Sequence, residues 1–518
     1  MSAVSAEIHL QFAVAHHPGL TRGWVVVVAL IVACAGCGEP ASPVAPPAET
    51  LSKNVSTQGK TPVAPTPRSK PRPAQPAQSV PQAENPNEAP KPDSEVELQD
   101  SLPASSAAGA IQAPREIDED RVKAHGIRTL TSRHLTLFTD FQIDAEIEQL
   151  PELFDRAVPQ WCGYFGLAEE IADAWRVRGH LMKERERFAA AGLLPDDLPD
   201  FVNGYALPNE IWWYDRSSAY YRRHLMLHEG THAFVFMARG DCGPPWYMEG
   251  LAELLGTHSL DDGKLRLGVF PSRPDDMESW DRIHLVRSAV ADGRLLPLAE
   301  IMAYELGVRS ETEPYGWCWA VSAFLDGHPR YRERFRKLPD ELPRKEFNRR
   351  VLAIFAGDWR DLNDEWEVFA AGIEFGYDLS RNAIEFTPGR PMPASGKELT
   401  IRADRGWQPS GVRLEAGAKY KIAATGRYQL AAGPPVWWCE PNGVTIRYRH
   451  GLPLGQLLAA VRYDDPEAGN GFLQPTAVGL ETELSPEKSG TLYLRINDSP
   501  AELADNAGML DVKVLSSQ

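Results

Sequence analysis

The sequence predicts an α+β domain, mostly helical with a small mixed sheet, followed by an antiparallel β-sandwich and preceded by a disordered stalk. Helical periodicity with a few short alternating runs dominates residues 116–377. From residue 378 to residue 518, short alternating runs are separated by Gly, Pro and Asn turns. Residues 38–115 are dense in Pro, Ala, Ser, Gln and Glu. Such a composition cannot bury enough apolar surface to fold, so this segment is expected to form the stalk.

The length and charge of the chain narrow the classes of function. A chain of 518 residues is long enough for two or three domains. Its formal net charge of −17 argues against a nucleic-acid partner, which would require a basic face.

The N-terminal segment has the pattern of an export signal. The apolar run Trp24–Ala33 is too short to span a bilayer comfortably and fits the apolar core of a signal peptide. The small residues before Cys37 resemble a bacterial lipoprotein signal over residues 1–37, in which Cys37 is cut free and lipidated. Ordinary secretion and a retained anchor are the alternatives. We therefore expect an exported protein of the cell envelope, held at a membrane by its N-terminal lipid or secreted, with residues 38–115 as an extended spacer.

The folded part is expected to begin with strands and helices that lead up to one long helix. Strands are expected over residues 134–141, 175–182 and 206–215, and helices over 145–165 and 183–191, the first of these interrupted by Pro151 and Pro159. Beyond the motif described next, helical patterns cover residues 280–291, 296–304, 315–325, 347–356 and 361–373.

The motif that carries chemistry is H-E-x-x-H, at His228, Glu229 and His232. Two histidines four positions apart lie on one face of a helix, where they can hold one zinc ion, and the intervening Glu can activate water. The helix is expected to end at Gly240. After a Gly-Pro-Pro break a second helix offers Glu249 and Glu253, again four apart. Glu249 is the candidate third ligand, and Glu253 could orient a ligand histidine from behind.

The segments HEGTHAF and PPWYMEGLAELLG, taken together, resemble the gluzincin metallopeptidases. They are particularly similar to a little-characterised group of secreted bacterial gluzincin-like proteins with a P-x-W-x-x-E-G-x-A-E signature. The resemblance implies a zincin-like fold, zinc held by His228, His232 and Glu249, Glu229 as general base, and a peptide or protein as substrate.

Two further site predictions come from the same resemblance. Zincins bind the substrate backbone along an edge strand placed before the zinc helix, which points to Ile211, Trp212 and Trp213; a core strand is the alternative. Gluzincins commonly use a Tyr or His of a later helix to stabilise the oxyanion. Tyr315 is the candidate by position, and a packing role is the alternative.

Export also permits disulfide bonds. A bridge between Cys242 and Cys318 beside the site is one expectation, and free buried thiols are the other.

The C-terminal segment contains seven runs with strand character. They cover residues 399–403, 412–414, 420–425, 444–448, 457–461, 491–496 and 510–515. Between the last two, residues 497–508 concentrate carboxylate and amide oxygens, which suit Ca²⁺.

The segment LRINDSPAELADNAGMLDVKV resembles the end of the calcium-dependent galactose-binding lectins of bacteria. The calcium ligands of that family fall on Asp498, the Glu502 backbone, Asp505 and Asn506, which makes a glycan a candidate partner. A polar turn that hydrogen-bonds to itself is the alternative.

Two functions follow from these features. The first is zinc-dependent hydrolysis of peptide bonds by an exported, surface-anchored metallopeptidase with an accessory β-sandwich. The second is a catalytically inert zinc-domain protein that binds glycan or another envelope component. The sequence does not specify the substrate, because a family resemblance does not fix specificity.

Overall fold

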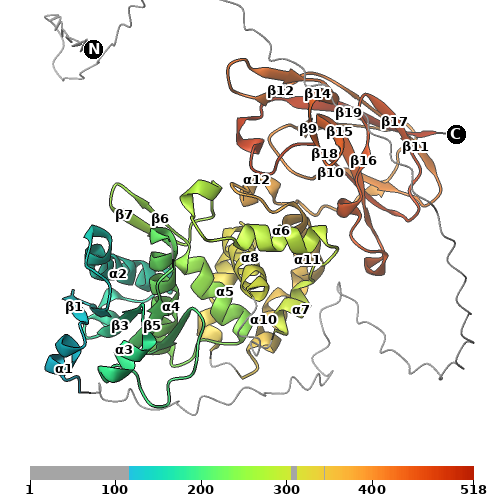
Figure 1. Ribbon diagram of the computed structural model, residues 1–518. Coiled ribbons are helices and arrows are strands. Elements are labelled where there is room, and N and C mark those ends of the chain that lie inside the picture. Colours follow the sequence, from blue (N-terminus) through green and yellow to red (C-terminus); the bar gives the residue numbers. More distant parts are fainter. Residues whose placement is uncertain (1–115, 217, 305–311, 343–344, 518) are drawn as a thin grey trace, which may run out of the picture. The chain divides into compact units, whose positions relative to one another are not determined.

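The computed structural model describes residues 116–216, 218–304, 312–342 and 345–517 (Figure 1). The predicted signal over residues 1–37 with Cys37, and the predicted stalk over residues 38–115, lie outside the described residues. The described residues form a mixed α+β fold, which confirms that part of the prediction. No helix among them is both long enough and apolar enough to cross a membrane.

The first sheet has the strand order β1-β2-β3-β5-β4. Its strands are β1 (Arg128–Thr131), β2 (Leu135–Thr139), β3 (Val177–Met182), β4 (Gly204–Leu207) and β5 (Glu210–Tyr214). β2, β3 and β5 run parallel, while β1 and β4 pair antiparallel at the two ends. The sheet is therefore mixed, and β4 forms one of its edges.

Helices cover both faces of this sheet. Trp213 and Ile211 of β5 share one apolar core with α2 (Ala145–Tyr164) and α4 (Ala219–Arg239). Trp212 faces the opposite side, in a smaller core with residues of α1 (Glu119–Ala124) and α3 (Arg185–Ala190). Because side chains alternate along a strand, β5 contributes bulky residues to both cores and is buried on both faces.

Helix α4 ends as its sequence predicts, and a side-chain cap marks its beginning. The Ser218 hydroxyl accepts a hydrogen bond from the backbone N–H of Tyr221 at the N-terminus. Gly240 follows the last helical residue with φ of 76°, a left-handed conformation that glycine adopts without steric cost. A short turn then leads into α5 (Pro245–Gly256), whose first residue is the proline that suits a helix N-terminus.

Helix α5 packs closely against α8 (Glu313–Gly327), and Gly250 makes this approach feasible. A Cβ atom at residue 250 would lie 2.5 Å from the backbone oxygen of Cys318 and would also overlap the Ser322 hydroxyl. Glycine directly after Glu249 therefore lets the helix that carries Glu249 approach the helix that carries Tyr315.

The remaining elements of the helix-rich part follow α5 in sequence. They are the hairpin of β6 (His258–Asp261) and β7 (Lys264–Leu267), then α6 (Arg282–Ala291), α7 (Leu298–Met302), α9 (Arg332–Arg336), α10 (Phe347–Phe355), α11 (Trp359–Gly372) and α12 (Leu379–Asn382). The predicted interruption of α2 does not occur: Pro151 and Pro159 both lie inside the helix. Pro151 is buried in the core, so tertiary packing outweighs the backbone hydrogen bond that proline cannot donate.

The C-terminal part consists of two larger sheets that share one apolar core. The first has the order β14-β15-β18-β10-β8 with β16 paired to β15, and the second has the order β17-β11-β19-β9. Leu414, Leu457 and Leu492 of the first sheet share this core with Ile422 and Val514 of the second, as expected for a β-sandwich. The pairing is antiparallel except that β8 runs parallel to β10.

The strands of this part are more numerous than the sequence predicts. They are β8 (Arg390–Pro391), β9 (Lys397–Arg402), β10 (Gln408–Leu414), β11 (Lys419–Thr425), β12 (Tyr428–Ala431), β13 (Trp437–Cys439), β14 (Asn442–Arg449), β15 (Leu452–Tyr463), β16 (Thr476–Ala477), β17 (Glu481–Leu484), β18 (Gly490–Ile496) and β19 (Met509–Ser517). β12 and β13, which form a separate two-stranded hairpin, were not among the predicted strands.

Candidate metal centre

Three side chains of α4 and α5 direct their ligand atoms at one point. Nε2 of His228 lies 3.1 Å from Oε2 of Glu249 and 3.2 Å from Nε2 of His232. Nε2 of His232 lies 3.4 Å from the same Glu249 oxygen. Two imidazole nitrogens and one carboxylate oxygen thus form a nearly equilateral triangle, which is one of the groups of side chains that could hold a metal ion.

The dimensions of this triangle suit zinc. Zinc–ligand bonds of about 2.0–2.1 Å in a tetrahedron place neighbouring ligand atoms about 3.3–3.4 Å apart. The separations of 3.1–3.4 Å between the ligand atoms match this spacing. Two histidine nitrogens that face each other at hydrogen-bond distance also require a proton or a cation between them, because both cannot accept. His228, His232 and Glu249 therefore fit a zinc ion by geometry and by chemistry.

The three ligand residues lie in an enclosed site. His228, His232 and Glu249 are each less than 10% exposed. Burial by itself would raise the pKa of Glu249, but the neighbouring His232 and His228 outweigh burial and lower that pKa to about 2. Glu249 therefore offers an anionic oxygen at neutral pH.

Glu229 lies beside this triad, on helix α4 with the two histidines, and under the edge strand β4. A Cβ atom at Gly204 would overlap the Glu229 Oε1 atom, so the backbone of β4 passes directly over the carboxylate. Burial is the main cause that raises the pKa of Glu229 to about 8, and the negative charges of Glu249 and Glu253 add to it. A carboxyl group whose pKa lies near neutrality is suited to accept and return a proton.

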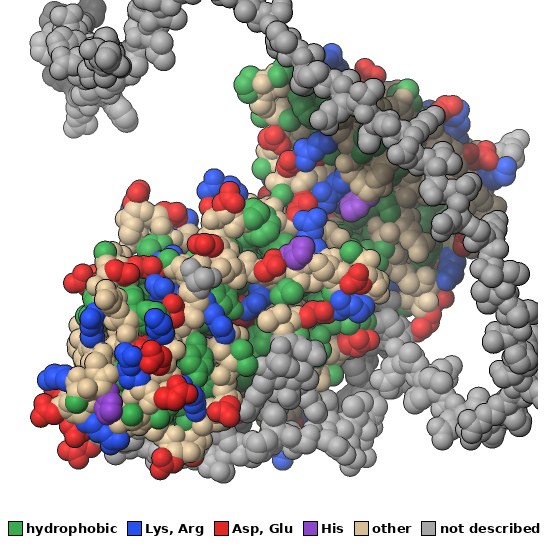
Figure 2. Space-filling view, viewed as in Figure 1, with side chains coloured by type: hydrophobic (Ala, Val, Ile, Leu, Met, Phe, Trp, Pro, Cys, Tyr) green, Lys and Arg blue, Asp and Glu red, His purple; other side chains and the backbone are tan. Residues whose placement is uncertain are grey.

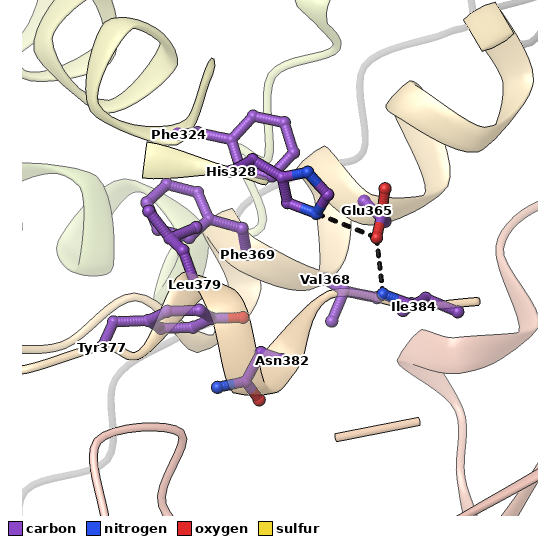
Figure 3. Close-up of a pocket in the computed structure, with 9 residues that line it drawn as sticks. All are labelled: Phe324, His328, Glu365, Val368, Phe369, Tyr377, Leu379, Asn382 and Ile384. Atoms are coloured by element: carbon purple, nitrogen blue, oxygen red, sulfur yellow. Dashed lines mark hydrogen bonds and ion pairs between the residues drawn. The ribbon is translucent and has the colours of Figure 1, made fainter. Parts of the chain in front are cut away.

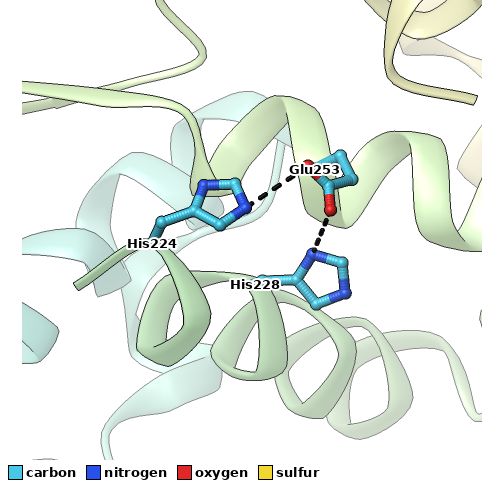
Figure 4. A group of neighbouring side chains, drawn as sticks. All are labelled: His224, His228 and Glu253. Carbon is cyan, nitrogen blue, oxygen red and sulfur yellow. Dashed lines mark ion pairs between the residues drawn. The ribbon is translucent and has the colours of Figure 1, made fainter. Parts of the chain in front are cut away.

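Glu253 contacts His228 at Nδ1, whereas Nε2 of His228 faces the triad. Figure 4 shows Glu253 together with His228 and His224. Oε1 of Glu253 lies 3.6 Å from Nδ1 of His228, which is an ionic contact longer than a hydrogen bond. Its Oε2 lies 3.3 Å from Nε2 of His224, one helical turn before His228. The structure thus brings Glu253 to the back of a ligand histidine, where the sequence predicts it.

His224, His228 and Glu253 form a second group of potential ligands around the shared His228. The guanidinium of Arg282, however, pairs with both oxygens of Glu253, at 2.7 and 3.0 Å. Because a divalent cation bound to Glu253 would lie beside this positive charge, we interpret the second group as support for His228.

Tyr315, in the first turn of α8, lies within electrostatic reach of the same carboxylates. The charge of Glu249, then burial, then the charge of Glu229 raise the pKa of Tyr315 well above its usual value. The phenol therefore stays protonated and can donate a hydrogen bond at neutral pH.

The predicted edge residues lie elsewhere. Ile211, Trp212 and Trp213 belong to β5, which lies between β3 and β4, and all three are fully buried. The run over residues 206–215 forms a hairpin in place of one strand, because a turn at Pro208 and Asn209 separates β4 from β5. The edge of the sheet next to Glu229 is therefore Gly204–Leu207, and the prediction for the three β5 residues is corrected.

Cys242 and Cys318 are both buried and both carry free thiols. The expected bridge between them is therefore absent, and the alternative of free buried thiols holds.

In the oxygen-rich loop of the sandwich, the side chains of Asp498 and Asn506 are in direct contact. Nδ2 of Asn506 donates to Oδ2 of Asp498 at 2.8 Å, while Oδ1 of Asn506 is buried without a hydrogen-bond partner. Burial raises the pKa of Asp498 to about 6. The Glu502 carboxylate pairs with Arg447 at 2.9 Å, and Asp505 Oδ2 accepts from the backbone N–H of Ala432 at 3.3 Å. Asp498, Asn506 and the backbone of this loop remain suitable donors for Ca²⁺.

A separate cavity lies between α8, α11 and the segment around α12 (Figure 3). Its main polar group, Glu365, accepts hydrogen bonds from His328 at 3.0 Å, from the backbone N–H of Ile384 at 2.6 Å and from Tyr331 at 2.5 Å. Because this buried carboxylate already has its partners, the cavity is a structural feature of the core.

On the face that Figure 2 shows, neither positive nor negative charge dominates the surface. Acidic and basic side chains are interspersed there over the helix-rich part.

Comparisons with known proteins find similarity among solved structures. No protein-family model matches the chain, and no curated protein matches it. Among solved structures, the chain is similar to one described as "EclA N-terminal domain; PllA-like lectin". The identity is 25%, and the match covers 23% of this chain and 96% of that chain with a TM-score of 0.19. A likeness at this TM-score carries no argument about fold or function.

Proposed function

We propose that this protein is a zinc-dependent peptidase with a zincin-like catalytic domain. The observation that carries the proposal is the triangle of His228, His232 and Glu249 ligand atoms with the Glu229 carboxyl beside it. The H-E-x-x-H helix followed by a glutamate helix supports it, because this is the order of ligands that the gluzincin resemblance implies.

In the proposed hydrolysis of a peptide bond, the triad, Glu229 and Tyr315 would each have a separate role. Zinc held by the triad would supply a Lewis acid that polarises a carbonyl and lowers the pKa of water. Glu229 would accept the proton of the attacking water and deliver it to the leaving amine as the C–N bond breaks. The protonated Tyr315 would donate a hydrogen bond to the carbonyl oxygen as negative charge develops there.

The edge strand suggests how an extended peptide would be aligned. β4 is the last strand of its sheet, and its residue Gly204 lies over Glu229. A peptide that adds to this edge as a further strand would run beside the general base. The substrate class we propose is therefore an extended segment of peptide or protein.

The experiment compares the full-length protein with two variants. Zinc content by mass spectrometry is expected to be about one per chain, lost in His228→Ala and retained in Glu229→Gln. Cleavage of a mixed synthetic peptide library is expected for the wild type and not for either variant. His284→Ala, which alters an exposed histidine, is the matched control. Full cleavage by zinc-loaded Glu229→Gln would refute the proposed mechanism.

A second candidate function is calcium-dependent glycan binding by the sandwich, with or without an inert zinc domain. The observation that favours it is the buried, unpartnered Oδ1 of Asn506 beside the Asp498 carboxylate. Trp438, 52% exposed, lies opposite Gln429, whose side chain donates to the backbone oxygen of Asp505. An exposed indole ring next to a cluster of oxygen ligands suits a sugar, which offers both an apolar face and hydroxyl groups.

This second function has its own test. Binding of the full-length protein to a glycan array is expected to require Ca²⁺, to be lost with a chelator and to be lost in Asn506→Ala. Zinc binding without peptide cleavage, together with glycan binding, would favour the inert-domain alternative. Glycan binding that persists in the chelator would exclude a role for calcium.

A further inference from the structure

Arg282 connects the helices of the metal centre, although it touches none of the three ligand residues through a hydrogen bond or ion pair. It is the first residue of α6, and its side chain is 8% exposed. Nη2 and Nε of Arg282 donate to Oε1 and Oε2 of Glu253 at 2.7 and 3.0 Å. This is a bidentate pair, the arrangement that fixes the plane of a carboxylate most firmly.

The charge of Arg282 matters because Glu253 is almost completely enclosed. The Glu253 side chain is 2% exposed, and both of its oxygens accept hydrogen bonds from the guanidinium of Arg282. Without the guanidinium, an ionised carboxylate would remain in a dry environment with only histidine contacts, which is costly. Arg282 therefore holds the Glu253 carboxylate in the place from which it contacts His228.

The same guanidinium also contacts two other helices. Its centre lies 5.9 Å from the ring centroid of Tyr315, on α8. Its Nη2 lies 3.5 Å from the Tyr221 hydroxyl, on the first turns of α4. One buried cation thus lies against α4, α5 and α8, the three helices that carry the candidate ligands, base and oxyanion donor.

We propose that Arg282 is a positioning residue of the metal centre. It holds Glu253 behind His228 and lies against the Tyr315 ring, so that the affinity of the site for zinc depends on a residue outside the ligand set. The inference rests on the proposed function, since it takes the triad of His228, His232 and Glu249 to be the zinc site. Supporting residues of this kind typically change metal affinity by about 10–100-fold.

The test measures zinc affinity by competition with a chromogenic chelator, using the full-length protein. We expect the zinc dissociation constant of Arg282→Gln to rise about 10–100-fold. Arg282→Lys keeps the charge but loses the planar two-point contact, so its affinity should lie between those of wild type and Arg282→Gln. The matched control is Arg330→Lys, which alters another arginine paired with a buried carboxylate, that of Glu365, and should leave zinc affinity unchanged.

A double variant separates positioning from general destabilisation. Once Glu253→Gln has removed the carboxylate, adding Arg282→Gln should change zinc affinity by less than about 2-fold, because the contact that Arg282 serves no longer exists. The double variant also buries no unpaired charge, so it keeps the comparison valid if Arg282→Gln alone fails to fold.

The outcomes distinguish this inference from the proposed function. If the wild type binds one zinc per chain, lost in His228→Ala, and Arg282→Gln and Arg282→Lys bind it as tightly, the positioning role is refuted while the zinc site stands. If the wild type binds two zinc ions and His224→Ala removes one, Glu253 is a ligand, and the role assigned to Arg282 is again refuted. If the wild type binds no zinc, both proposals fail together.

Discussion

Gly204 lies so close to Glu229 that a Cβ atom at residue 204 would overlap the Oε1 atom and come within 2.7 Å of Cδ. The neighbouring atoms belong to the flexible end of a side chain, so a methyl group there would push the carboxylate aside rather than strain the backbone. The edge strand and the candidate base are therefore matched to each other by the absence of a side chain.

We expect Gly204→Ala to lower kcat/KM for peptide cleavage by about 100-fold or more, because a displaced general base loses its contribution. The free energy of unfolding should change little, and zinc content should stay at the wild-type level. Ala206→Gly, two residues along the same face of β4, is the control and should retain most activity. Wild-type activity in Gly204→Ala would show that the close approach has no catalytic role.

Gly250→Ala, unlike Gly204→Ala, should lower the free energy of unfolding. The added methyl group would meet the backbone oxygen of Cys318, which cannot move without shifting α8. Overpacking of this kind costs about 1–3 kcal/mol, measured as the free energy of unfolding in urea. Gly163→Ala is the matched control, because no atom lies within 4 Å of its added Cβ atom; its stability should equal or slightly exceed that of the wild type.

Removing the metal should lower the thermal midpoint of unfolding. Zinc that binds the folded state alone stabilises it by about 2.7 kcal/mol at a free concentration 100 times the dissociation constant. A chelator should reverse this gain in the wild type and should have no effect on His232→Ala, which lacks one ligand. An equal response of both proteins to zinc would place the metal outside the triad.

His258 should make the protein sensitive to acid. Nδ1 of the His258 ring contacts the Gly256 oxygen at 2.8 Å, and its Nε2 accepts from Arg223 at 3.3 Å, an arrangement that fits the neutral ring. Burial lowers the pKa of His258 to about 3. The unfolded chain therefore binds this proton below pH 6.5, whereas the folded chain does not until about pH 3.

The free energy of unfolding should consequently fall as the pH falls from 6.5 toward about 3. His258 should contribute up to about 1.4 kcal/mol per pH unit to this fall. Urea unfolding at pH 7.5, 6 and 5 measures the slope, which should be smaller by that amount in His258→Gln. An unchanged slope in the variant would mean that His258 does not contribute.

The sequence predicted the H-E-x-x-H helix, the second helix and the mixed α+β class because these depend on local patterns. His228 and His232 share a face by helical periodicity alone, and Gly240 and Pro245 bound the helices by their backbone preferences. The edge strand was misassigned because the continuous apolar run of β4 and β5 masked its only turn signal, Pro208 and Asn209.

Arg282 and Gly204 could not be predicted in the same way. Arg282 pairs with Glu253, 29 positions away, and although the sequence marks Glu253, no repeat or motif marks Arg282. Gly204 lies in a short strand, where no sequence pattern distinguishes it from any other glycine. Its role depends on the close approach of helix α4, which begins at Ala219. Such residues are defined by tertiary contacts, which a pattern of neighbours in sequence does not contain.

The candidate ligands His228 and Glu249 are only 21 positions apart, on helices joined by a short turn. During synthesis, both helices would therefore emerge before Arg282 and Tyr315 do. Closing so short a loop costs little chain entropy, so the helical hairpin could bring His228 and Glu249 together and bind a metal ion first. Arg282 and Tyr315 would then pack against that hairpin. The order of residues along the chain thus allows the candidate ligands to meet before Arg282 and Tyr315 are added to the site.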